Sequence, residues 1–140
     1  MLALFSVLSL TAQKNKKKDA NLPAFGVVEK ADLEMKECDF DNKAEAVVLL
    51  DDGELSFTTS SELKRRVRIK ILNEKGLDAA NIHLKYRSEK MRQDINKLEA
   101  QTYNLDANGN IVITKVEGKL IYEKKLNKKY SEKVFTFPDV

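Results

Sequence analysis

The sequence predicts a mainly β fold, a mostly antiparallel sandwich, on three observations. Residues 63–72 alternate apolar and polar side chains, which is the period of a strand with one buried face. Short segments of similar character recur from residue 46 onward, and turn-forming residues separate them. The chain has 140 residues, enough for one domain with its own hydrophobic core.

Seven or eight short strands and one short helix are expected. The helix is predicted near residues 31–37, where Asp32 can cap the first turn. The apolar residues 46–50 predict a buried strand that enters a tight turn at residues 51–53, and turns are also predicted at residues 73–76 and 106–110. The other predicted strands are residues 55–59, 63–72, 82–86, 111–116, 120–124 and 134–137, together with the end of residues 95–105.

The longest predicted strand has two chemically different sides. Val67 and its apolar neighbours two and four positions on point one way, and this side is expected to be dry. Arg66, Arg68 and Lys70 point the other way and form a candidate contact surface. A solvated face without a partner is the open alternative.

The N-terminus has the composition of an export signal. Residues 2–10 are an apolar run, too short for a membrane span of roughly 20 residues. We therefore expect residues 1–12 to be a signal-peptide remnant, residues 13–24 a disordered tether and residues 25–140 the domain. Cys38 is the only cysteine, so no disulfide can form within the chain.

The charge balance does not indicate a nucleic-acid partner. The net charge is +3, and the lysine-rich segment at residues 14–18 exceeds it alone. An export signal argues further against nucleic acid, and no membrane span is expected.

Catalytic and metal sites are weakly supported. Cys38 lies between two acidic residues, which raise the pKa of a thiol and so disfavour a nucleophile paired with His83. Asp106, Asn108 and Asn110 have the spacing of a calcium loop, but an Asn-Gly pair within them is typical of a hairpin turn. Neither a cofactor nor a catalytic residue is expected.

Five strings, in order, resemble one family. They are LEMK at residues 33–36, AVVL at 46–49, RVRIKILNEKG at 66–76, TYNL at 102–105 and FTFP at 135–138. In this order they resemble the domain of unknown function 3857, which precedes transglutaminase-like domains in exported proteins of Gram-negative bacteria. Members of that family continue past the last string, so the chain looks like a truncated copy.

The resemblance implies a fold and a context. The fold would be an immunoglobulin-like β-sandwich, incomplete at the C-terminus, in a periplasmic or cell-surface protein. It assigns no catalytic residues to this domain, because the Cys, His and Asp of the papain-like site belong to the domain that follows. The expected function is a non-catalytic module that positions or regulates this downstream domain, or binds its substrate.

Two other functions stay open at this point. One is a free-standing adhesin or polysaccharide-binding sandwich, with a peptide or a cell-envelope polymer as its ligand. The other is an enzyme that acts through Cys38, which predicts a thiol that reacts at neutral pH in the folded state.

Overall fold

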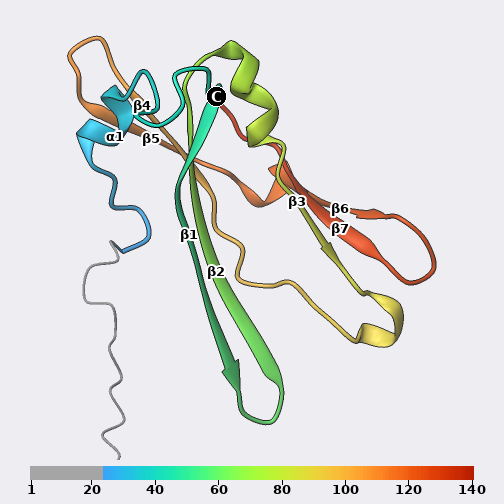
Figure 1. Ribbon diagram of the computed structural model, residues 1–140. Helices are drawn as coiled ribbons and strands as arrows, with labels where there is room; N and C mark the ends of the chain where they lie inside the picture. Colours follow the sequence, from blue (N-terminus) through green and yellow to red (C-terminus); the bar gives the residue numbers. More distant parts are fainter. Residues whose placement is uncertain (1–23) are drawn as a thin grey trace, which may run out of the picture.

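Figure 1 shows the computed structural model, which describes residues 24–140. The expected signal-peptide remnant lies outside the described residues, as does the expected tether except for Ala24. The described part is mainly β, with antiparallel sheets and few, short helices, as the sequence predicts. In residues 24–140 no helix is long and apolar enough to cross a membrane.

The α-helix α1 spans Lys30–Glu34 and confirms the short helix expected near residues 31–37. The cap prediction was wrong, because Asp32 lies inside the helix and Glu29 precedes it. The Asp32 carboxylate instead accepts a hydrogen bond of 3.0 Å from Arg68. The Asp32 carboxylate therefore bonds Arg68, which is distant in the sequence, and does not bond the free amides at the start of the helix, as the local pattern predicts.

A long antiparallel hairpin joins β1 (Ala46–Phe57) to β2 (Ser61–Ile71). The tight turn predicted at residues 51–53 is wrong, because β1 runs through these positions and the chain reverses at residues 58–60. Asp51 accepts two hydrogen bonds from Arg65 across the hairpin, of 2.8 and 2.7 Å. Cross-strand pairing thus overrides the local turn preference of an Asp-Gly pair.

The residues after β2 form a 3₁₀ helix, η1 (Glu74–Ala80), at the turn predicted for residues 73–76. The Asn73 side chain accepts a hydrogen bond of 3.0 Å from the Lys75 amide, which starts the helix. Gly76 is buried, and a Cβ atom there would lie 2.0 Å from the Glu45 carbonyl oxygen. The close approach that glycine permits holds η1 against the start of β1.

The second sheet has the order β3 (His83–Tyr86), β7 (Ser131–Phe135), β6 (Ile121–Lys125), all antiparallel. The strands expected at residues 82–86 and 120–124 are confirmed, whereas the one expected at residues 134–137 begins earlier and ends at Phe135. The 3₁₀ helix η2 (Glu89–Met91) follows β3, and the 3₁₀ helix η3 (Gly118–Leu120) directly precedes β6. The last strand of the chain thus becomes the central strand of the sheet.

The third sheet is the hairpin of β4 (Gln101–Leu105) and β5 (Ile111–Lys115). The turn predicted at residues 106–110 is confirmed. The C-terminal tail contacts this hairpin, because the Asn104 side chain donates a hydrogen bond to the Asp139 carbonyl and Thr114 donates one to its carboxylate. The tail therefore joins the second sheet to the third.

Three buried apolar residues lie on the central strand β7 or beside it: Val134 and Phe135 on β7, and Tyr86 on β3. Cys38, the other buried apolar residue within residues 24–140, lies in the turn that it forms with Asp41. Phe135 also stacks on Phe137, with ring centroids 6.0 Å apart. The antiparallel sheets are consistent with a β-sandwich-like fold, and within residues 24–140 several large apolar side chains of the β1–β2 hairpin are exposed.

Candidate functional site

The predicted contact surface is occupied largely by the chain itself. The Arg68 guanidinium donates hydrogen bonds to the Asp32 carboxylate (3.0 Å) and to the Val27 carbonyl oxygen (2.5 Å). The Lys70 ammonium donates one of 2.8 Å to the Leu33 carbonyl oxygen, and burial lowers the pKa of Lys70. Arg66 pairs with Asp52 across the hairpin at 3.7 Å. Arg68 and Lys70 thus dock residues 27–33 against the hairpin.

The two sides of β2 therefore differ from the dry and wet sides that the sequence predicts. The basic residues Arg66, Arg68 and Lys70 are half-buried, whereas Val67 on the apolar side is 46% exposed. The alternation itself is present, but the expected division into a dry and a wet side is not, because Ile69 and Ile71 on the apolar side are half-buried like the basic residues. A long side chain such as Arg68 can bury its stem and still bond its charged end, and this lets a basic face be the covered one.

The other side of the hairpin presents exposed apolar side chains on both sides of an exposed ion pair. Opposed residues of an antiparallel pair share a face, and so do residues two positions apart in a strand. The pairs Leu55–Leu63, Phe57–Ser61, Asp51–Val67 and Val48–Ile69 therefore all lie on one side. We call this side the apolar hairpin face, and its exposed members are Val48 (58%), Leu55 (56%), Phe57 (74%), Leu63 (62%) and Val67 (46%).

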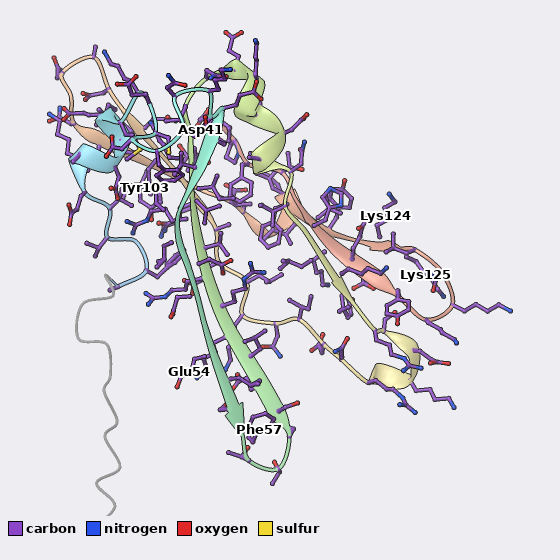
Figure 2. All side chains as sticks on the ribbon, in the orientation of Figure 1. Asp41, Glu54, Phe57, Tyr103, Lys124 and Lys125 are labelled. Atoms are coloured by element: carbon purple, nitrogen blue, oxygen red, sulfur yellow. The ribbon has the colours of Figure 1, made fainter. Side chains whose placement is uncertain are left out.

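The apolar hairpin face projects away from the other elements. In Figure 1 the distal parts of β1 and β2 extend beyond the remaining sheets, and Figure 2 places Phe57 at the far end. The exposed Asp51–Arg65 ion pair lies in the middle of this face, with Leu55 and Leu63 beyond it. Its hydrogen bonds lower the pKa of Asp51 and raise that of Arg65.

His83 and Cys38 belong to different parts of the fold. The His83 Nδ1 lies 3.2 Å from a carboxylate oxygen of Glu132, and the Lys124 ammonium lies 3.6 Å from the other. Glu132 is 8% exposed, so these partners on β3 and β6 compensate a carboxylate buried in the central strand. Cys38 is 5% exposed in the turn that it forms with Asp41. A thiol so buried is a poor nucleophile for an external substrate.

The candidate calcium loop is a hairpin turn. One Asp106 carboxylate oxygen accepts hydrogen bonds from the Asn108 and Asn110 amides, both 2.8 Å, and the other accepts one from the Asn110 side chain. The Asn110 side-chain bond, followed by its backbone bond, lowers the pKa of Asp106. The carboxylate thus closes the β4–β5 turn. No group of three or more His, Cys, Asp or Glu side chains within residues 24–140 could hold a metal ion.

The clearest hollow lies beside η1 and the second sheet. It has a volume of about 320 Å³ and an open mouth, and its lining includes Leu77, His83, Tyr122 and Phe137. The lining is mixed, with Asn81 and Thr136 as further polar side chains, and His83 already pairs with Glu132. The open mouth would leave a small molecule largely exposed, whereas ligand sites bury most of their ligand.

No family model, no curated protein and no solved structure matches this chain. The resemblance to the domain of unknown function 3857 therefore stays an expectation.

Sequence reasoning missed the apolar hairpin face, although the signal for it was present. Leu55, Phe57, Leu63 and Val67 can be recognised as one side of two alternating strands. The pattern does not predict whether another element covers that side, because this depends on where every other element packs. The pairing of Leu55 with Leu63 also needed the position of the turn, which sequence reasoning misplaced.

Proposed function

We infer that this chain is a non-catalytic β module of an exported transglutaminase-like protein, where it positions or regulates the downstream catalytic domain or binds its substrate. The observation that carries this proposal is the apolar hairpin face. Exposed apolar residues scattered singly are normal, but five on one side of one hairpin mark an interaction surface, here with one ion pair among them.

The shape of this face favours a second protein layer over a small ligand. A two-stranded ribbon encloses nothing by itself, and the sheets of β proteins bury their apolar side against another layer. Residues 27–33 already cover part of the opposite side through Arg68 and Lys70. Residues 27–33 therefore pack on one side of the hairpin, and the exposed apolar side chains of the other side can pack against another protein layer.

The proposed cover is the transglutaminase-like domain that the family resemblance implies. The coding sequence beyond Val140 is the first test. A Cys-His-Asp transglutaminase-like region there supports the proposal. A stop codon or repeated sandwiches would favour the free-standing adhesin or polysaccharide-binding module.

The second test is a calorimetric titration of the separately produced downstream domain with this chain. The double variant Leu55→Glu and Leu63→Glu puts two opposed carboxylates in the distal part of the face, beyond the ion pair. Because binding would desolvate both, we expect the affinity to fall by at least about tenfold. Both leucines are more than half exposed, so the variant is expected to fold, which circular dichroism can check.

The matched control is Phe40→Glu, at a side chain that is 87% exposed and lies outside the hairpin. It adds the same kind of charge without touching the apolar hairpin face, and its affinity is expected to equal that of the parent. If the double variant also binds as tightly as the parent, the hairpin face is not the docking surface.

A further inference from the structure

One end of the three-stranded sheet is strongly basic. Residues 85–92 and 123–133 meet there, because Ser88 and Ser131 share a hydrogen bond of 2.9 Å and the Glu89 amide donates one of 3.2 Å to the Lys129 carbonyl. These two segments, which we call the basic sheet end, carry nine basic and three acidic side chains, a net charge of +6. Basic and acidic side chains are equal in number over residues 24–140, so the remainder carries −6.

All three carboxylates of the basic sheet end are already paired. Glu89 pairs with Arg87 at 2.7 Å, Glu123 with Lys133 at 2.9 Å and Glu132 with Lys124 at 3.6 Å. The side chains that make no ion pair with a carboxylate of the described residues are Lys85, Lys90, Arg92, Lys125, Lys128 and Lys129, and all six are exposed. Asp94, two residues beyond these segments, acts on Lys133 and Tyr86 and lowers the excess to +5. A solvated face usually mixes charges of both signs, whereas this end keeps a clear positive excess.

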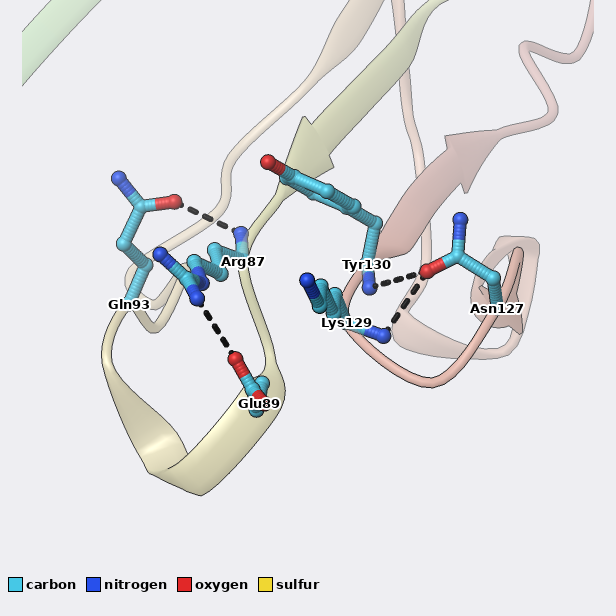
Figure 3. Close-up of polar contacts among 6 residues, drawn as sticks. All are labelled: Arg87, Glu89, Gln93, Asn127, Lys129 and Tyr130. Carbon is cyan, nitrogen blue, oxygen red and sulfur yellow. Dashed lines mark hydrogen bonds and ion pairs between the residues drawn. The ribbon is translucent and has the colours of Figure 1, made fainter.

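The loop at the apex of the basic sheet end has a fixed shape. The Asn127 side-chain oxygen accepts hydrogen bonds from the Lys129 and Tyr130 amides, of 2.8 and 3.0 Å, as Figure 3 shows. The amides of Leu126 and Asn127 both donate to the Tyr130 carbonyl. The Lys85 ammonium lies 4.9 Å from the centre of the Tyr130 ring. The loop is thus preorganised, and it presents Leu126, 38% exposed, between Lys125 and Lys128.

The lysines surround this apex. Neighbouring residues of a strand point to opposite faces, so Lys124 and Lys125 lie on the two faces of β6, and Figure 2 shows both near the outer end of the sheet. A partner on one face would meet only part of the charge. A partner that meets the sheet end-on contacts Lys125, Lys128 and Lys129 together, with Leu126 beside them at the start of the loop.

We propose that the basic sheet end docks on the surface of an anionic lipid bilayer. Leu126 enters the boundary between headgroups and acyl chains, and the surrounding lysines contact lipid phosphates. A flat, dense array of phosphates complements point charges arranged around an apolar apex. Nucleic acid fits less well, because base recognition uses exposed aromatic rings and the Tyr130 ring is engaged by Lys85. This proposal does not depend on the proposed function.

The test measures binding of the full chain to vesicles of phosphatidylcholine with phosphatidylglycerol, and to vesicles of phosphatidylcholine alone. Each lysine near an anionic surface strengthens binding about fivefold, so the variant Lys125→Gln, Lys128→Gln, Lys129→Gln should bind the anionic vesicles on the order of a hundredfold more weakly. The control variant Lys43→Gln, Lys64→Gln, Lys115→Gln removes the same charge at exposed lysines elsewhere and should stay within about threefold of the parent.

A second measurement reports on the apex alone, independently of residues 1–23. The chain has no tryptophan, so Leu126→Trp places a single fluorophore at the apex. Its emission should shift to the blue with anionic vesicles and be quenched by brominated acyl chains. Tyr122→Trp, at the other end of β6, should do neither.

Two outcomes overturn the proposal. One is Leu126→Trp emission that does not change with anionic vesicles, whatever the total binding. The other is equal binding by the two triple-glutamine variants. Apex-dependent binding to an acidic polysaccharide or to single-stranded DNA with none to vesicles would likewise reject a lipid surface and assign the site to a soluble polyanion.

Discussion

At the scale of single residues, the absence of a side chain at Gly76 lets the backbone of η1 pack closely against the residue before β1. A Cβ there would meet the Glu45 carbonyl oxygen at 2.0 Å, and the next closest atoms also belong to the backbone. Backbone atoms cannot turn away as a flexible side chain can, so η1 would have to separate from β1. We expect Gly76→Ala to lower the free energy of unfolding by about 3 kcal/mol, measured by urea denaturation.

Gly118 provides the matched control, because no atom lies within 4 Å of a Cβ built there. Gly118→Ala should leave stability unchanged or raise it by up to about 1 kcal/mol, since alanine restricts the unfolded chain. Equal destabilisation by both substitutions would show that the close approach at Gly76 is not what matters.

At the scale of elements, α1 and the segment before it depend on Arg68. Its guanidinium bonds both the Asp32 carboxylate and the Val27 carbonyl, and both side chains of the ion pair are less than a third exposed. Arg68→Ala removes these bonds and leaves the carboxylate without its partner. We expect amide hydrogen exchange in residues 27–33 to speed up by an amount equivalent to about 2 kcal/mol, while the β4–β5 hairpin keeps its protection.

Arg65→Ala is the comparison for this prediction, because Arg65 points to the other side of the hairpin and pairs with Asp51 in an exposed position. It should not change exchange in residues 27–33. Faster exchange of that segment in Arg65→Ala as well would mean that the segment responds to the hairpin as a whole and not to Arg68.

The elements that could be predicted from the sequence are those whose signals are local. Alternation located β2, and the Asn-Gly pair located the β4–β5 turn, where Asp106 bonds its own neighbours. Local signals misled at Asp51 and Gly53, because their partners lie across the hairpin on β2. The candidate contact surface suffered from the same limit. Arg68 and Lys70 were recognised as one face, but their contacts come from residues 27–33, which no local pattern connects to β2.

At the scale of the whole molecule, two exposed surfaces of different chemistry lie on separate sheets. The apolar hairpin face belongs to β1 and β2, and the basic sheet end belongs to β3, β6 and β7. The hairpin projects in one direction and the β6–β7 loop in another (Figure 1). The two surfaces can therefore be occupied at once, as docking on a lipid surface and on a neighbouring domain together would require.

The apolar hairpin face also determines how the chain behaves alone in solution. Without a partner, two copies can bury these faces against each other, because a twofold axis brings the same surface of both copies together. Its five large apolar side chains form a surface smaller than the roughly 800 Å² per partner of a stable complex. We therefore expect weak, concentration-dependent self-association, with a dissociation constant on the order of 10–100 µM, measured by sedimentation velocity. Leu55→Glu with Leu63→Glu should abolish it. Phe40→Glu with Tyr122→Glu makes the same change in net charge at exposed aromatic residues outside the face and should retain it. The prediction is contradicted if the parent chain stays monomeric at every concentration. It is contradicted as well if the control dissociates as readily as the leucine variant, because the apolar hairpin face would then not drive the association.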